Sequence, residues 1–154
     1  MLKDKQGFTL IELLIVIGIT LLLAAASVPI YGNLQVSSQM HDSVSQIAQT
    51  IRTARVRSVA RLNNSSHGVY LEINAGSDDR FILYQGSSYI ARDIDYDRAI
   101  SLDEALSISS TFSNNDINFS RGFGTTTAGM LTVTHDTGDI ANIIVNVYGM
   151  AEEN

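Results

Sequence analysis

The sequence predicts an α+β fold, in which one long N-terminal helix packs on a mainly antiparallel β-sheet. The chain of 154 residues opens with an apolar run and continues into a segment with helical periodicity. Short β-rich runs separated by turn residues then follow to the C-terminus. A helix followed by strands is the order of an α+β domain. Fewer than about a hundred residues of strand and loop bury little surface alone, so the helix and the sheet must share one core.

The N-terminal run is apolar enough to predict a membrane-spanning helix. Residues 13–30 are mainly Leu, Ile, Val and Ala, and Glu12 is the one charged side chain between Lys5 and His41. A spanning helix needs roughly 20 mostly apolar residues, a length that this run reaches when residues 8–10 are counted with it.

The short head before this run predicts the orientation of the helix in the membrane. It carries Lys3 and Lys5 against Asp4. Because positive charge is retained on the cytoplasmic side, we expect the N-terminus in the cytoplasm and everything after Ile30 on the outer side.

An alternative interpretation is a secretory signal that is removed at the small residues 24–27. It gives Glu12 no role, although an acidic residue inside a membrane helix costs on the order of a few kcal/mol and usually marks a function and a partner. If Glu12 instead lies near the end of the helix, its side chain simply reaches water.

The segment after the apolar run is predicted to continue the helix with one apolar face. Apolar residues recur there in steps of four, three and four, and then less regularly. They are Met40, Val44, Ile47, Ile51, Val59 and Leu62. A nearly continuous helix over residues 8–62 would be roughly 80 Å long at about 1.5 Å per residue. Pro29, with Gly32 after it, is expected to kink or loosen this helix, because proline lacks an amide donor.

Six β-rich runs are expected to form the sheet, after a cluster of turn formers at 63–68. The runs are 69–73, 81–84, 106–112, 117–119, 131–134 and 140–148. The residues at 136–139 are typical of a hairpin turn between the last two runs.

Composition argues against several functions. The formal net charge of −6 disfavours nonspecific attraction to nucleic acid or anionic lipid. The chain has no cysteine, so no disulfide helps to hold the fold. His41, His67 and His135 are far apart in the sequence, and we expect them at the surface or in turns. Without a nucleophile elbow or a glycine-rich phosphate loop, the sequence predicts neither an enzyme nor a resident cofactor.

The first residues of the apolar run resemble a known processing signal. The stretch Gly7-Phe8-Thr9-Leu10-Ile11-Glu12, with the apolar residues after it, is similar to the start of type IV pilins and pseudopilins. The resemblance implies cleavage after Gly7 by a prepilin peptidase and methylation of the new amine on Phe8. It also implies that Glu12 meets the amine of a neighbouring subunit, since opposite charges attract strongly in a low dielectric.

The resemblance further implies how the chain is organised and where it resides. Its four segments would be a cleaved leader at 1–7, a transmembrane and assembly half of the helix at 8–30, an amphipathic half at 31–62, and a β-rich domain at 63–154. The subunit would cross the inner membrane once, with its C-terminal domain on the periplasmic or extracellular side. It would then enter a pilus or pseudopilus together with other pilins, through an inner-membrane assembly platform. Pro29 would belong to the assembly segment.

A second resemblance covers the C-terminal third. Residues 117–122, 131–134 and 143–149 are similar to the β-rich domain of the GspH/FimT type of pseudopilins, which are minor subunits. The absence of cysteine agrees with a minor subunit, because many major pilins carry a C-terminal disulfide loop. Residues 84–106 match neither resemblance, so they are the expected place for a specific function.

One acidic pattern in that middle region is a calcium candidate. Its carboxylates are Asp93, Asp95, Asp97 and Glu104. Their spacing is that of the first, third, fifth and twelfth positions of a calcium loop, but Arg98 occupies the sixth position, where glycine makes the turn. The alternative is a polar connection in which Ile94 and Tyr96 point inward and the aspartates point to water.

Four arginines late in the predicted helix leave two functions open. They are Arg52, Arg55, Arg57 and Arg61. One interpretation is a solvated face, paired with acidic loops, on a structural subunit. The other is a DNA-contacting patch on a pilus-tip binding module that takes DNA, a surface or a secreted substrate. The acidic C-terminal segment 150–154 argues against the DNA patch, because the resemblance places DNA binding in a basic C-terminal region.

Overall fold

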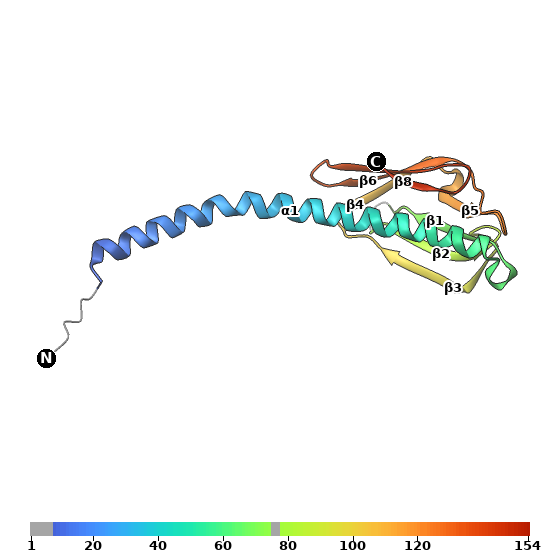
Figure 1. Ribbon diagram of the computed structural model, residues 1–154, viewed down its shortest axis with the longest axis horizontal. Coiled ribbons are helices and arrows are strands. Elements are labelled where there is room, and N and C mark those ends of the chain that lie inside the picture. Colours follow the sequence, from blue (N-terminus) through green and yellow to red (C-terminus); the bar gives the residue numbers. More distant parts are fainter. Residues whose placement is uncertain (1–7, 75–77) are drawn as a thin grey trace. The chain divides into compact units, whose positions relative to one another are not determined.

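A computed structural model describes residues 8–74 and 78–154, with the side chains of 26–33 left out of the description (Figure 1). Compactness divides the chain into unit 1, Met1–Ser37, and unit 2, Ser38–Asn154. Both units include part of helix α1, Leu10–Val59, and unit 2 adds two antiparallel sheets. The predicted α+β class is therefore confirmed.

In unit 2, helix α1 buries the face that its periodicity predicted. Met40, Val44, Ile47 and Ile51 are all buried. The last two positions of the pattern were predicted wrongly, because Val59 is 41% and Leu62 46% exposed. The helix ends at Val59, Arg61 takes a left-handed conformation with φ of 53°, and Leu62 lies in the short 3-10 turn Leu62–Asn64. This change of backbone direction takes Leu62 out of the helical repeat.

The helix assignment of α1 runs unbroken through residues 26–33. Pro29 and Gly32 lie in that range, where the side chains are outside the described residues, so the kink at Pro29 stays a prediction. Among the described residues, no helix meets the length and apolarity of a membrane span.

Two four-stranded sheets complete unit 2, and every strand pair in them is antiparallel. The first sheet has the order β3-β2-β1-β5, with bounds Arg92–Ser101, Arg80–Gly86, His67–Glu72 and Asp116–Phe119. The second has the order β4-β6-β7-β8, with bounds Leu106–Ser110, Gly129–His135, Ile140–Val145 and Ala151–Glu153. A second 3-10 turn, Ser113–Asn115, precedes β5.

The six predicted β-rich runs are all found as strands, and two further strands were missed. Strand β3 is an edge strand that is mostly exposed, so it lacks the apolar alternation that marks a half-buried strand. Strand β8 has three residues, of which two are glutamates. Both strands are defined by their pairing with neighbours more than by their own composition.

One core joins α1 to both sheets, as expected (Figure 1). Ile47 and Ile51 from the helix belong to the same cluster as Phe119 from the first sheet and Leu131 from the second. All four are 0% exposed. Each such side chain contributes about 1.5–3 kcal/mol of hydrophobic free energy, so this shared core holds unit 2 together.

Candidate functional site

The first turn of α1 is fixed by a threonine cap. The Oγ1 atom of Thr9 accepts a hydrogen bond from the backbone N–H of Glu12 at 3.2 Å. The backbone carbonyl of Thr9 accepts from the N–H of Leu13, also at 3.2 Å. Thr9 is therefore the N-cap, which satisfies donors that a helix start leaves without partners. With Glu12 three residues later, the sequence has the spacing of a capping box.

Glu12 lies in the part of the helix that best tolerates a negative charge. It is in the first turn of α1, where the aligned peptide dipoles carry a partial positive charge. Phe8, just before the cap, is 86% exposed. Gly7, the other half of the predicted cleavage site, lies outside the described residues.

The rest of this segment is apolar on its surface. Large apolar side chains from Leu10 to Leu23 are exposed, including Ile11 at 62% and Leu22 at 73%. Burying such side chains is favourable by about 25 cal/mol per Å² of apolar area. Here a lipid or protein neighbour would have to bury them. The segment thus carries one carboxylate within a long exposed apolar surface.

The calcium candidate does not gather its carboxylates. Asp93, Asp95 and Asp97 lie along β3, and the described residues contain no group of three or more acidic, His or Cys side chains able to hold a metal ion. Asp97 instead receives a hydrogen bond from Nε of Arg92 at 2.7 Å, in a largely buried salt bridge. Glu104 is exposed in the turn between β3 and β4.

The expectation that Ile94 and Tyr96 point inward was wrong, because they are 69% and 50% exposed. The register explains why: Leu83 pairs with Arg98, but Gln85 pairs with Asp93, so four residues of β3 stand opposite one residue of β2. This irregularity leaves 94–97 without regular pairing to β2. Sequence alternation cannot reveal such an insertion, since it is a property of the pairing.

Sequence reasoning also missed an aromatic cluster on the first sheet. Tyr70 and Tyr89 stack with their ring centroids 3.6 Å apart, and the guanidinium of Arg92 lies 3.7 Å from the Tyr89 ring. Nearby, the hydroxyl of Tyr84 donates a hydrogen bond to Asp116. Burial, together with the Asp116 bond, raises the pKa of Tyr84 well above its usual value. These contacts hold the loop between β2 and β3 against the sheet.

Two histidines also differ from expectation. His41 is exposed as expected, but His67 and His135 are buried. The Nδ1 atom of His67 has no hydrogen-bond partner among the described residues. Burial, followed by the positive charge of Arg57, lowers the pKa of His67. The turn-rich context of His67 suggested exposure, but the residue begins the central strand β1.

The arginines of α1 contact the C-terminal segment of the chain. Arg52 pairs with Glu153 at 3.2 Å and donates to the carbonyl of Ala151. Nε of Arg55 donates to the carbonyl of Tyr148 at 2.8 Å. Glu153 in the acidic C-terminal segment thus forms a salt bridge with Arg52, as expected for a charged face paired with acidic groups.

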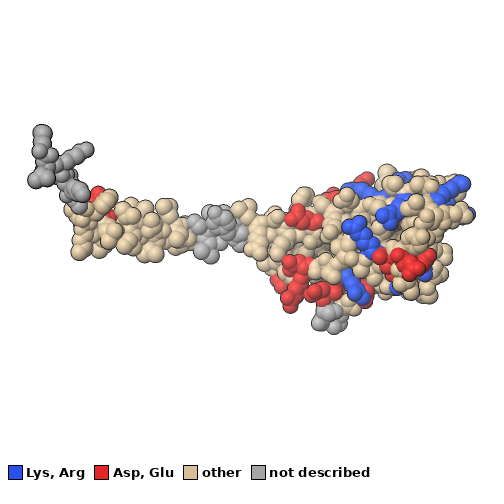
Figure 2. Space-filling view, turned by 90° about the horizontal axis from the view of Figure 1, so that it is seen from below, with Lys and Arg blue, Asp and Glu red and all other residues tan. Residues whose placement is uncertain are grey.

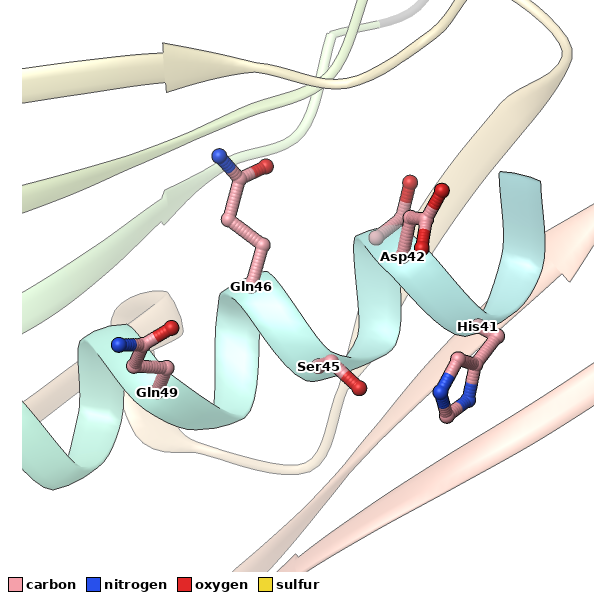
Figure 3. Close-up of a pocket in the computed structure, with 6 residues that line it drawn as sticks. His41, Asp42, Ser45, Gln46 and Gln49 are labelled. Carbon is pink, nitrogen blue, oxygen red and sulfur yellow. The ribbon is translucent and has the colours of Figure 1, made fainter. Parts of the chain in front are cut away.

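A shallow depression on α1 has no convergent chemistry. His41, Asp42, Ser45, Gln46 and Gln49 line it. Figure 3 shows the His41 and Gln46 side chains pointing in different directions from the helix. Polar groups that face away from one another do not converge on a ligand, so this surface carries no site.

A comparison with family models identifies the first segment. The model described as the prokaryotic N-terminal methylation motif matches residues 2–28. Comparisons with curated proteins and with solved structures find no match. The motif indicates a type IV pilin-like subunit that prepilin peptidase processes, and it implies a membrane-anchored precursor that later assembles with other pilins. It suggests a structural subunit and not an enzyme.

Proposed function

We propose that this chain is a structural minor subunit of a type IV pilus or of a type II secretion pseudopilus, cleaved between Gly7 and Phe8. The methylation motif at 2–28 carries the proposal. Thr9 and Glu12 support it, because they form the capped first turn that would follow the cleavage site. The GspH/FimT type is part of the proposal, and it rests on the β-rich C-terminal segments and the absence of cysteine.

Cleavage would create the chemical partner that Glu12 lacks. Hydrolysis of the peptide bond after Gly7 leaves a positive amine on Phe8, and methylation retains its charge at neutral pH. The Thr9 cap keeps the first turn helical, so Glu12 projects from a defined position. In a low dielectric, the carboxylate and the amine of a neighbouring copy attract strongly. One axial register of the two helices would satisfy both charges, and Glu12 would select it.

The same segment would anchor the precursor. We propose that residues 8–30 cross the inner membrane once, with Lys3 and Lys5 in the cytoplasm and the C-terminal domain on the other side. An inner-membrane assembly platform would then move the subunit into the filament. Exposed apolar side chains from Leu10 to Leu23 support this anchor, since they need a lipid or helical environment.

Mass spectrometry of the membrane-extracted protein tests the proposal. We expect an N-methylated Phe8 terminus in cells that contain prepilin peptidase, and an intact Met1 terminus in cells that lack it. Gly7→Val is the matched variant, since a branched side chain before the cleaved bond should leave the precursor uncut without changing residues 8–154. An intact Met1 terminus in peptidase-containing cells would refute the proposed processing.

A further inference from the structure

A cleft with a volume of about 180 Å³ lies between helix α1 and strands β2 and β3 of the first sheet. Side chains from the helix and from both strands line it: Gln46, Gln49, Thr50, Thr53, Leu83, Arg98 and Ile100. Pockets for drug-sized ligands enclose about 300–1,000 Å³. This cleft therefore has room for a group the size of one amino-acid side chain.

The pairing of β3 with β2 turns Arg98 and Ile100 towards the helix. Residues that stand directly opposite each other in an antiparallel pair share one face of the sheet. Arg98 stands opposite Leu83, and Ile100 stands opposite Phe81, and both partners belong to the core that the sheet shares with α1. Leu83 is 3% exposed, so it forms the floor of the cleft, whereas Arg98 is exposed at the rim. Both β3 residues also belong to the range 84–106, the expected place for a specific function.

The helix wall of the cleft supplies hydrogen-bonding groups from one face of α1. The four helix residues follow the spacing i, i+3, i+4 and i+7, which places them on that face. The hydroxyls of Thr50 and Thr53 donate to helix carbonyls at 2.8 and 2.7 Å, so each retains only acceptor capacity. Figure 3 shows Gln46 pointing away from His41 and towards the strands of the first sheet. Within the described part of the chain, the side-chain amides of Gln46 and Gln49 make no hydrogen bond, so both can meet a ligand.

Arg98 supplies the positive charge of the cleft. The strands of the first sheet carry three arginines, of which Arg80 forms a salt bridge with Glu72 and Arg92 forms one with Asp97. Figure 2 shows basic side chains lying beside acidic ones on one face of unit 2. Arg98 differs, because its guanidinium forms no salt bridge or hydrogen bond with any residue in 8–74 or 78–154. Its charge and its donors are therefore available to a ligand.

We propose that the cleft binds one carboxylate carried on a short aliphatic chain, either a free acid or the side chain of a glutamate in a partner peptide. The guanidinium of Arg98 would hold the carboxylate through two parallel N–H···O bonds. The amides of Gln46 and Gln49 would donate to its remaining lone pairs, and the methylene groups would lie on Leu83 and Ile100. A phosphate dianion fits less well, because a single guanidinium leaves one of its charges unbalanced. This binding goes beyond the proposed structural role and does not depend on processing of the N-terminus.

Saturation-transfer NMR of butyrate with the detergent-solubilised full chain tests this site. Butyrate has the length and charge of a glutamate side chain, and butyramide is its uncharged counterpart of equal size. We expect butyrate to bind in the millimolar range, because so small a ligand makes few contacts. Butyramide should bind at least about tenfold more weakly, since it lacks the charge that Arg98 recognises. Equal binding of the two compounds, or no binding of butyrate, overturns the inference.

Substitutions at the rim locate the bound carboxylate. Arg98→Gln should weaken butyrate binding by about tenfold, because it removes the charge and leaves a polar side chain. Gln46→Glu should weaken it several-fold, since a like charge at the rim repels the carboxylate. The matched control is Arg121→Gln, which removes the same charge at an exposed arginine that contacts Asn64 outside the cleft; it should bind as the wild type does. An equal loss in Arg121→Gln, or unchanged binding by Arg98→Gln, overturns the inference.

Two blocked tripeptides separate a free acid from a partner peptide as the source of the carboxylate. One carries glutamate between two glycines, and the other carries glutamine there. Tighter binding of the glutamate peptide than of butyrate assigns the cleft to a peptide, and equal or weaker binding assigns it to a free acid. Equal binding of the two peptides overturns carboxylate recognition. Mass spectrometry of the same samples, taken from peptidase-containing cells, keeps the two proposals apart: an intact Met1 with bound butyrate refutes the proposed function alone, whereas a methylated Phe8 without butyrate binding refutes the cleft alone.

Discussion

In the described part of unit 1 a single carboxylate, Glu12, stands among exposed apolar side chains, whereas unit 2 buries many of its apolar side chains in one core. Unit 2 has a core that includes Ile47, Phe119 and Leu131. The described part of unit 1 has no such core, since its large apolar side chains are exposed. Stability in unit 2 therefore comes from the chain itself, while unit 1 depends on what surrounds it.

Because of this difference, folding and assembly should depend on different regions of the chain. A substitution in the core of unit 2 removes contacts within one copy, so it should change the free energy of unfolding. A substitution at Glu12 removes a charge that has no acidic or basic neighbour between Lys5 and His41, so it should change what the chain joins. The two regions can thus be tested by different measurements on the same protein.

The largest expected effect is on the core of unit 2. Phe119 is 0% exposed and lies in the shared cluster of α1 and both sheets. Phe119→Ala should lower the free energy of unfolding by about 3–5 kcal/mol, because it removes buried area and leaves a cavity. Chemical denaturation of the detergent-solubilised full chain measures this loss.

The control is the same substitution at the surface. Phe123 is 77% exposed, so Phe123→Ala should change the free energy of unfolding by no more than about 0.5 kcal/mol. Equal effects at the two positions would contradict the described core.

A smaller loss is expected at the buried polar group beside the aromatic cluster. Tyr84 donates to Asp116 and accepts from Asn118. Tyr84→Phe leaves both partners without this hydroxyl and should cost about 1–3 kcal/mol. The raised pKa of Tyr84 also means that its stabilising effect is present below about pH 10 and is lost as the pH rises towards the folded-state value.

The alkaline arm of a stability–pH curve checks this assignment. The wild-type chain should lose stability above about pH 10, and Tyr84→Phe should flatten that loss. Tyr96→Phe, at a side chain that is 50% exposed on β3, is the control and should leave the curve unchanged. A curve for Tyr84→Phe that parallels the wild type would argue against a buried neutral phenol.

In unit 1, substitution of Glu12 should change filament assembly and not the stability of the fold. Glu12→Ala should lower incorporation into filaments by about tenfold, which corresponds to about 1.4 kcal/mol of lost contact. Membrane extraction and the unfolding of unit 2 should stay as in the wild type. Glu12→Gln should behave similarly, since it keeps the shape and removes the charge. Immunoblotting of sheared filaments measures incorporation, and normal incorporation of both variants would remove the assembly role.

The difference between local patterns and contacts between distant segments also explains which features could be predicted from the sequence. The motif around Glu12 and the repeat Met40, Val44, Ile47 and Ile51 are local patterns, so they predicted the processing segment and the helix face directly. Leu62 extended that repeat wrongly, because the left-handed residue Arg61 after the helix end is not visible in periodicity. Val59, the last residue of α1, is in the helix but 41% exposed.

The missed features of unit 2 depend on pairing between distant segments. The irregular pairing around Ile94 and Tyr96 comes from the register of β3 against β2. The loops near residues 123 and 148 meet α1 through Gly124 and Gly149, and the buried setting of His67 requires β1 inside its sheet. No local pattern of residues fixes such contacts.

The smallest expected effect concerns His67. Its pKa is lowered by burial and by Arg57, so the folded state favours the neutral imidazole. A lowered pKa stabilises the fold above the unfolded value of about 6.5, and this contribution is lost as the pH falls below that value and through the lower folded-state pKa. The wild-type chain should therefore lose stability as the pH falls below about 6.5, and His67→Gln should reduce the slope. His41→Gln, at an exposed position on α1, should retain the wild-type slope, and the same flattening in both variants would show that the loss arises elsewhere.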